Sequence, residues 1–438
     1  MANLKSKFAF YFLFSTSFLF SAFVVPAQDK TVSGTNQAAE SKRDLIFPGL
    51  LKKEELEAGN PLATYAEMIE LEKEYRASKI FAAIYPEVRF NFEQFLGLPL
   101  SGLQAMQLPS LRTTGKGGNL TTIPESFKPE KAVDVIEREA QKTRIVIRAE
   151  EHHLPQTRSL YEQLLKRLWK HGYRYLAAET FTDNVMRSGF KYPDYKTGYY
   201  TRDPVYASAV RTAIKLGYKL IAYDTTERGS ADNQSFRDQK QAINIKERIL
   251  DKDSQAKILI LAGRGHASEE IAQDGWTPMA NVLKKISGID PFTVYAPTMN
   301  QRLTPEEEHP LYRFAVSRGL VKQPTIFVNK TENNILGPGF CDVYVFFPRV
   351  NILHGRPDWM ETELGRKKVK IPERFLIGKG LQLIQAFELD QPATTIPIDQ
   401  ILVEHGEKKI LMLPKGKFRF RAIDKNSRVL NQTTVNVW

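Results

Sequence analysis

Cysteine is almost absent from this chain, which has 438 residues and one cysteine, Cys341. A single cysteine excludes a disulfide within the chain, so a hydrophobic core must stabilise the fold. Hydrophobic residues make up 42% of the sequence, which is ordinary for a globular protein. A chain of this length can bury one large core and carry a second, smaller unit.

Several signatures of familiar chemistry are also missing. The sequence contains no His-Glu-x-x-His and no two histidines four residues apart, which disfavours a zinc-peptidase helix. It contains no Gly-x-Ser-x-Gly, which disfavours a serine nucleophile on a strand-to-helix turn. Lys116 stands among glycines, but the spacing of a phosphate-binding loop is not there. Any catalytic group must therefore come from a less familiar arrangement.

The formal net charge is +12, yet Lys and Arg are spread along the chain and alternate with acidic residues. Nucleic-acid-binding proteins usually gather their basic residues in a stripe or a tail. We therefore expect no nucleic-acid partner and favour a small-molecule substrate. The pattern does not indicate an oligomeric state.

Only one long hydrophobic run is present, from Phe8 to Val25. Lys5 and Lys7 precede it, and small residues at Val25 and Ala27 follow it, which is typical of a secretory signal peptide. We expect a signal peptide over residues 1–27, cleavage near Ala27, a secreted or periplasmic protein and no stable membrane span after cleavage. A retained anchor is the alternative, because a run of about 18 residues approaches the length that spans a bilayer.

Composition divides the remaining chain into three parts. Residues 28–128 are a polar lead-in and a helical extension, whose helical pattern over 61–96 is interrupted by Pro86. Residues 129–365 alternate between short apolar runs and amphipathic helices, apart from an irregular stretch over 300–365. Residues 366–438 change character again. We expect an α/β domain between a helical extension and a C-terminal β domain.

The alternation predicts a three-layer α/β fold with a mostly parallel sheet and helices on both faces. The expected strands are 144–149, 173–178, 218–223, 257–262 and 292–296, with a further apolar run at 342–347. The expected helices cover roughly 129–141, 156–171, 204–215, 234–250 and 278–287. Two of them should begin at N-caps followed by proline, Asp203-Pro204 and Thr277-Pro278. Four charged residues of the second helix should face solvent: Arg158, Glu162, Lys166 and Lys170.

The C-terminal region reads as an all-β, sandwich-like domain. In Phe418-Arg-Phe-Arg-Ala the apolar residues fall on every second position, as in a half-exposed antiparallel strand. Aromatic residues on such strands usually pack in a core, so we expect Phe418, Phe420 and Trp438 to be buried. None of these strands ends in a cluster of histidine and carboxylate, so we expect a separable unit with no part in the chemistry.

Ionisable residues follow four consecutive strands of the predicted sheet. The carboxyl ends of parallel strands meet at one edge, where ligands bind in open α/β sheets. We therefore expect these residues to converge into one site. They are Glu150, Glu151, His152 and His153 after the first strand, Glu179 after the second, Asp224 after the third, and Arg264 and His266 after the fourth.

Two chemistries suit this set. In the first, a histidine held by a carboxylate acts as general base on water, and Arg264 or a second histidine stabilises the oxyanion. In the second, His152, Glu179 and His266 bind a divalent metal such as Zn²⁺ or Mn²⁺ that activates the water. His153 and Asp224 are secondary candidates, because each is as readily a solvated neighbour or a loop cap as a participant.

At these residues the sequence resembles the erythromycin esterase and ChaN-like superfamily. Ala149-Glu-Glu-His152 is similar to its Gly-Glu-x-His motif, and Glu179 and Gly263-Arg-Gly-His266 are similar to its later Glu and Gly-x-Gly-His motifs. The resemblance covers roughly residues 129–300, with Ala149 in place of a glycine and Arg264 as an added cation. It implies a three-layer α/β fold whose functional set is Glu150, His152, Glu179 and His266, with His152 as the base.

Members of this superfamily include ester hydrolases, haem-binding envelope proteins and metal-dependent proteases, so the resemblance does not select one reaction. We expect an exported hydrolase that cleaves an ester or related acyl bond with water activated by His152. The alternative is an envelope protein that binds haem or a metal ion at the same strand ends. Tyrosines after Glu179 could ligate haem iron or could simply pack the loop: Tyr195, Tyr199, Tyr200 and Tyr206.

Overall fold

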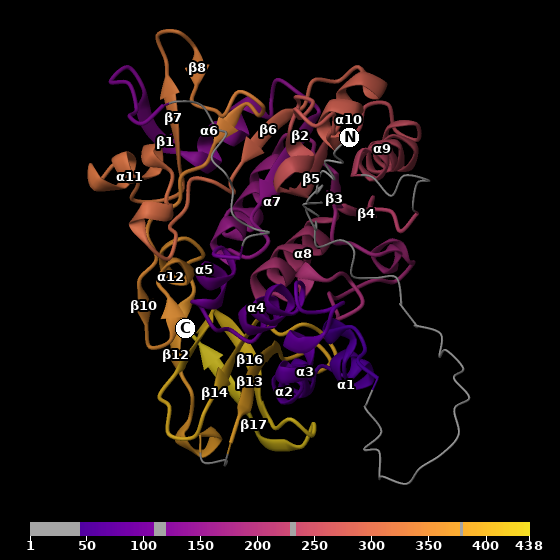
Figure 1. Cartoon of the computed structure of the whole chain (residues 1–438), viewed down its shortest axis with the longest axis vertical. Helices are drawn as coiled ribbons and strands as arrows, with labels where there is room; N and C mark the ends of the chain where they lie inside the picture. The colour runs from indigo at the N-terminus through magenta and orange to yellow at the C-terminus, as the bar shows by residue number, and fades with distance from the viewer. Residues whose placement is uncertain (1–43, 109–119, 228–233, 377–379) are drawn as a thin grey trace, which may run out of the picture.

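The structure is a computed structural model, which describes residues 44–108, 120–227, 234–376 and 380–438 (Figure 1). The predicted signal peptide, residues 1–27, lies outside the described residues. Within the described ranges, no helix has the length and apolarity needed to cross a membrane.

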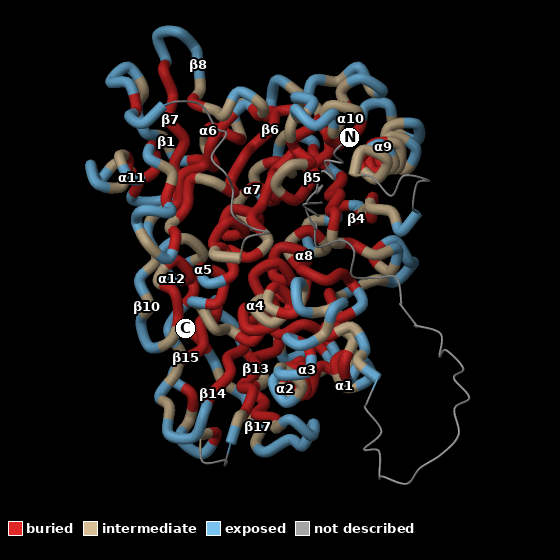
Figure 2. Tube along the Cα trace, in the orientation of Figure 1, coloured by how far each residue is buried: buried red, intermediate tan, exposed pale blue. Residues whose placement is uncertain are grey.

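A six-stranded parallel sheet forms the centre of the middle domain, in the order β4-β3-β5-β2-β6-β9. Its strands are β2 (Ile145–Glu150), β3 (Tyr175–Ala178), β4 (Lys219–Ala222), β5 (Ile258–Gly263), β6 (Phe292–Tyr295) and β9 (Val343–Tyr344). Both β2 and β5 are buried along their whole length, as expected for strands covered on both faces (Figure 2). The predicted α/β class is confirmed.

Helices cover both faces of this sheet, and alternate residues of each strand contribute to different cores. Val146 of β2 belongs to a core that includes residues of α7 (Tyr161–Lys170) and α8 (Pro204–Leu216). Ile147 belongs to a second core, which includes residues of α9 (Gln234–Ile245) and α10 (Met279–Ser287). A π-helical turn, Lys246–Leu250, continues α9.

The sequence predicted N-caps for α8 and α10, and the structure confirms the first and not the second. Asp203 caps α8 as predicted, since its side chain accepts a hydrogen bond from the amide of Val205. Thr277 does not cap α10, so that expectation is wrong. The side chain of Asp238, in α9, accepts from the amide of Met279 at 2.6 Å. The cap therefore comes from another helix, which a local pattern cannot reveal.

Arg158 is the clearest correction within the helices. We expected it on the solvent face of a helix over 156–171, but it lies in the 3-10 turn Pro155–Arg158 that precedes α7. The different turn geometry directs its side chain inward, where it is 1% exposed.

The stretch 300–365 is more regular than expected. It contains α11 (Pro310–Ser317), α12 (Trp359–Thr362), β7 (Thr325–Asn329) and β8 (Asn334–Ile335), and the short pair β10 (Ile352–Leu353) and β11 (Arg356–Pro357). β7 pairs antiparallel with β1 (Lys128–Lys131), so the helix predicted from residue 129 begins later, as α6 (Ala132–Glu139). The pairing spans almost 200 residues of sequence, and no local signal encodes it.

The N-terminal extension is helical, as predicted. Its helices are α1 (Lys53–Glu57), α2 (Pro61–Glu70), α3 (Glu72–Ala77), α4 (Tyr85–Phe95) and α5 (Ser101–Ala105). Pro86 lies in the first turn of α4, so this proline begins a helix and does not break one.

The C-terminal region consists of antiparallel strands: β12 (Lys367–Lys370), β13 (Gln382–Glu388), β14 (Asp399–Val403), β15 (Ile410–Leu413), β16 (Gly416–Ile423) and β17 (Val429–Val437). One sheet has the order β14-β13-β16-β17, and β12 pairs with β15. Phe418 and Phe420 are buried as expected. Trp438 is 84% exposed, so the expectation for it is wrong. It follows the last residue of an edge strand, where no neighbouring strand covers it.

The β region packs against the N-terminal helices below the parallel sheet (Figure 1). The amide of Leu402 donates to the carbonyl of Leu96 at 2.8 Å, and the side-chain amide of Gln400 donates to the carbonyl of Phe95 at 2.7 Å. Arg356 forms a buried ion pair with Asp399. Whether the β unit can be separated remains a prediction, and these contacts are what a truncation would break.

Candidate functional site

The strand order brings the predicted residues to one edge of the sheet. β4, β3, β5 and β2 are neighbours in that order, and all four are parallel. In this register Glu150, the last residue of β2, lies opposite Gly263, the last residue of β5. Glu179 directly follows β3, and Asp224 lies just beyond β4.

His152 and Glu150 form a hydrogen-bonded pair, with Nδ1 of the imidazole 2.7 Å from Oε1 of the carboxylate. Arg158 binds both oxygens of Glu150, from Nη2 at 2.9 Å and from Nε at 3.0 Å. The hydroxyl of Tyr161 donates to the same carboxylate. The carboxylate is thus held from three sides, and its remaining interaction fixes the orientation of the His152 ring.

The electrostatics keep Glu150 ionised. Burial works against its charge, but the guanidinium of Arg158 and the hydrogen bond with His152 outweigh burial and lower the pKa of Glu150 to about 2. Arg158 is itself held by Asp203, whose Oδ2 lies 2.7 Å from Nη1. An ionised acceptor opposite Nδ1 favours the tautomer in which His152 carries its proton on Nδ1.

The His152 ring is packed on one side and closely approached by backbone. Tyr200 stacks on it, with ring centroids 4.0 Å apart and planes 11° from parallel. A Cβ on Gly263 would lie 2.6 Å from Nε2 of His152 and 3.1 Å from Oε2 of Glu179. Nε2 therefore faces the end of β5 beside Glu179, and only a glycine fits there.

Glu179 lies between the His152–Glu150 pair and a second charged pair, Arg237 and Asp224. Its Oε2 accepts from the amide of Gly263 at 2.6 Å, and its Oε1 accepts from Nη2 of Arg237 at 2.7 Å. Arg237, in α9, also binds both oxygens of Asp224, at 2.9 and 2.8 Å. Burial opposes ionisation of Glu179, but the charges of His266 and Arg237 outweigh it and hold its pKa well below the ordinary value.

His266 lies between two carboxylates. Its Nδ1 is 2.7 Å from Oδ1 of Asp238, and its Nε2 is 3.4 Å from Oε1 of Glu179 and 3.1 Å from Nη1 of Arg237. Burial disfavours a charged ring, but the charges of Asp238 and Glu179 prevail and raise the pKa of His266 to about 10. The two carboxylates therefore favour the protonated form of the His266 ring.

Asp238 is the residue that fixes His266. It is fully buried, and besides His266 it accepts hydrogen bonds from the indole of Trp276 at 3.0 Å and from Gln234 at 3.0 Å. It also caps α10. The second half of the site thus depends on how α9 and α10 pack beyond β5.

Three of the predicted residues form a separate cluster. Nε of Arg264 lies 2.6 Å from Oε2 of Glu151, and Nδ1 of His153 lies 3.3 Å from Oε1 of the same carboxylate. Glu87, in α4, lies 3.5 Å from the other nitrogen of His153. Burial disfavours the charge on His153, but hydrogen bonds to Glu151 and Glu87 raise its pKa. This cluster joins the sheet to the N-terminal helices, and Arg264 is paired with Glu151.

The three candidate metal ligands, His152, Glu179 and His266, each contact another charged side chain of the protein. These side chains interact with Glu150, Arg237 and Asp238. Nowhere in the described ranges do three His, Cys, Asp or Glu side chains group as a metal ion would require. The donor set as arranged forms ion pairs and hydrogen bonds.

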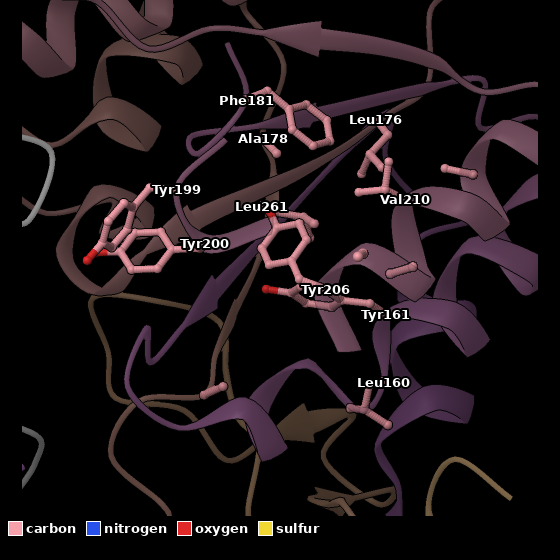
Figure 3. Close-up of a cluster of buried hydrophobic side chains, with 14 of the residues drawn as sticks. Leu160, Tyr161, Leu176, Ala178, Phe181, Tyr199, Tyr200, Tyr206, Val210 and Leu261 are labelled. Atoms are coloured by element: carbon pink, nitrogen blue, oxygen red, sulfur yellow. The ribbon is translucent and has the colours of Figure 1, made fainter. Parts of the chain in front are cut away.

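The tyrosines after Glu179 are buried among core side chains: Tyr195, Tyr199, Tyr200 and Tyr206. Figure 3 shows Tyr199 beside Tyr200, and Tyr206 beside Tyr161. Tyr206 also lies under the guanidinium of Arg158, at 5.4 Å from ring centroid to Cζ. The sequence left open whether these tyrosines ligate haem iron or pack the loop. Packing accounts for their positions in the structure.

Several residues of the site carried no visible signal of their role in the sequence: Arg158, Tyr161, Arg237 and Asp238. Arg237 and Asp238 are adjacent charged residues of a helix, which a pattern reading places at the surface. Asp203 was recognised as a helix cap, and the structure adds its ion pair with Arg158. Distant charged side chains that pair in a buried site can be found only once the fold is known.

Fold and site together define an α/β protein with a parallel sheet and a buried His-carboxylate site at the strand ends. The chain matches no protein-family model, and the search of curated proteins finds no significant match. Among solved structures, the type III effector HopBA1 aligns with a TM-score of 0.30 and 16% identity over 43% of this chain and 96% of that one.

Proposed function

We propose that the protein is an exported hydrolase of the erythromycin esterase and ChaN-like type, which cleaves an ester or related acyl bond with water. The observation that carries the proposal is the His152–Glu150 pair, at 2.7 Å and with an ionised carboxylate. A histidine that holds its proton on Nδ1 presents Nε2 as a base, the arrangement that activates a nucleophile in many hydrolases. Export rests on the signal-peptide pattern of residues 1–27.

The opposed environments of the two histidines support distinct roles. Glu150 is hydrogen-bonded to His152, whereas Asp238 and Glu179 flank His266 and raise its pKa to about 10. A histidine held by one carboxylate and a histidine that lies between two carboxylates are suited to different parts in one reaction. His152 would be the base, and the His266 imidazolium would stabilise negative charge.

The proposed reaction has two steps. His152 Nε2 takes a proton from water as the water oxygen bonds to the acyl carbon, and the carbonyl oxygen becomes an oxyanion stabilised by the positive charges of His266 and Arg237. The carbon–oxygen bond of the ester then breaks, and the leaving alkoxide receives the proton from His152. Glu150 stabilises the transient imidazolium of His152 and keeps its own charge.

The test is turnover of a panel of p-nitrophenyl esters and a macrocyclic lactone by purified protein and by single variants. His152→Ala and His266→Ala should each reduce kcat/KM by at least about 100-fold. His405→Ala is the matched control, because this exposed histidine lies in a turn of the β region. Near-wild-type turnover by either site variant, with His405→Ala as the benchmark, would remove the assignment.

A metal-assisted route is separated in the same experiment. Elemental analysis of protein purified without chelators, and turnover after EDTA treatment, distinguish the two chemistries. The general-base proposal expects full turnover in EDTA. Loss of turnover that returns on adding Zn²⁺ or Mn²⁺ would replace it with the metal mechanism.

A further inference from the structure

A cleft of about 100 Å³ lies where the three regions of the chain meet. Its walls come from the segment around α5, from the loop after His152, from the start of α8, from α12 and from β14. Figure 1 shows α5 and α12 between the parallel sheet and the C-terminal strands. The lining residues include neither His152 nor His266, so the cleft is distinct from the proposed catalytic pair.

Most of the cleft surface is apolar. The side chains that supply this surface include Leu98, Leu103, Leu154, Val205, Trp359 and Met360. Leu103 is 8% exposed and Trp359 is 5% exposed, so both belong to walls and not to an open face. A concave apolar surface with a few polar groups is the usual form of a small-molecule site.

Three polar side chains in these walls each have a buried atom with no hydrogen-bond partner among the described residues: Gln94, Asn300 and Arg356. The atoms are two donors, Nε2 of Gln94 and Nε of Arg356, and one acceptor, Oδ1 of Asn300. Each of the three residues is less than 8% exposed. Leaving such groups without partners costs free energy, which a ligand with a matching acceptor and donor would recover.

The charges in the cleft are already neutralised by the protein. Arg356 is paired with Asp399, and Asp203 is paired with Arg158. A charged ligand would have to be desolvated here with no opposite charge left to meet it. The cleft therefore favours a neutral ligand.

We propose that this cleft binds a small, uncharged molecule that has an apolar body and an amide group. The amide carbonyl accepts hydrogen bonds from the wall donors, and the amide N–H donates to Asn300. The apolar body packs on Leu103 and Trp359. This inference does not depend on hydrolysis at His152, because it concerns binding in a cleft that neither proposed catalytic histidine lines.

The probe is octanamide, compared with octanoate and octylammonium, which have the same chain length and opposite charges. Calorimetry on the full mature chain should give a Kd on the order of 0.1–1 mM for octanamide, a ligand of about ten non-hydrogen atoms. Both charged analogues should bind at least about 10-fold more weakly. Equal or tighter binding of either charged analogue, or no octanamide binding at about 10 mM, would overturn the proposal.

Variants locate the site. Leu103→Trp should fill the cleft and abolish octanamide binding, whereas Leu389→Trp, at a position that is 46% exposed and outside the cleft, should not. Gln94→Met keeps the length of the side chain but removes the donor, and should weaken octanamide binding about 5- to 10-fold. Octanamide should also change the fluorescence of Trp359, which lines the cleft. Trp359→Phe should retain calorimetric binding but lose that change in fluorescence. Unchanged binding in both Leu103→Trp and Gln94→Met would place the ligand elsewhere and refute the inference.

Discussion

A methyl group on Gly263 would lie 2.6 Å from Nε2 of His152, closer than any real side chain approaches. The backbone at Gly263 has φ −73° and ψ 163°, an ordinary extended conformation. The glycine is therefore needed for space and not for backbone freedom. Gly263, the last residue of β5, therefore leaves the space that the ring of His152 occupies after the neighbouring strand β2.

Gly263→Ala tests this relationship. We expect the methyl group to displace the His152 ring, which should lower kcat by about 10- to 100-fold and cost about 1–3 kcal/mol of stability. Ester turnover and urea unfolding measure the two effects. Wild-type kcat in a variant whose unfolding midpoint has fallen would show that His152 Nε2 takes no part in the reaction.

Glu150→Gln tests the function of the carboxylate. The glutamine keeps the size but not the charge, so the Nδ1 tautomer of His152 loses its ionic acceptor and kcat should fall by about 100- to 10,000-fold. Arg158 also loses a partner in a buried site, at a cost of about 3–5 kcal/mol.

The matched control is Glu151→Gln. This neighbouring carboxylate is also buried and also pairs with an arginine and a histidine, Arg264 and His153. We expect a similar loss of stability but retained kcat. If the two variants lose kcat equally, both clusters act in catalysis or both losses reflect unfolding, which circular dichroism would distinguish.

Those parts of the fold that depend on local sequence patterns could be predicted from the sequence. All six strands of the parallel sheet overlap predicted apolar runs, and β2 and β5 each end one residue later than predicted. A strand buried on both faces is mostly apolar, so its position shows in the sequence. β1 and β7 were missed because their pairing depends on distant residues. Trp438 was misjudged because period-two alternation identifies a strand but not whether its end is covered.

Only part of the candidate site could be predicted from the sequence. Parallel strands made it possible to predict that Glu150, His152, Glu179 and His266 meet at one edge. The sequence could not show that Arg264 and His153 belong to another cluster, because successive residues after a strand end diverge to different sides. Nor could it indicate Asp238, whose role depends on the packing of α9 against α10.

Stability should depend on pH through His266. Its pKa in the folded protein is raised from 6.5 to about 10, so folding favours the protonated ring. This contribution is fully present below about pH 6.5 and is lost as pH rises toward 10. The difference in unfolding free energy between wild type and His266→Gln should therefore shrink by roughly 4 kcal/mol over that interval. Urea titrations at pH 6.5, 8 and 9.5 measure it, and a constant difference would show that folding does not raise the pKa of His266.

The ion pair between Arg356 and Asp399 should stabilise the attachment of the C-terminal strands. Both side chains are at most 5% exposed, and Arg356 also donates to the carbonyls of Gly97 and Gln400. Asp399→Asn leaves a buried guanidinium without its counter-charge and should cost about 3–5 kcal/mol. Lys425 and Glu70 provide a matched pair that also joins the β region to the N-terminal helices, with side chains that are 55% and 67% exposed.

Glu70→Gln should cost no more than about 1 kcal/mol, because solvent screens that exposed pair. Urea unfolding of the two variants, followed by circular dichroism, measures the difference. A single cooperative transition that moves to lower urea in Asp399→Asn would mean that the β strands and the parallel sheet unfold together. Two separate transitions would mean that the β region is an independent unit, as the sequence predicts. Equal costs for the two variants would contradict the claim that burial of the Arg356–Asp399 pair makes it the stronger link.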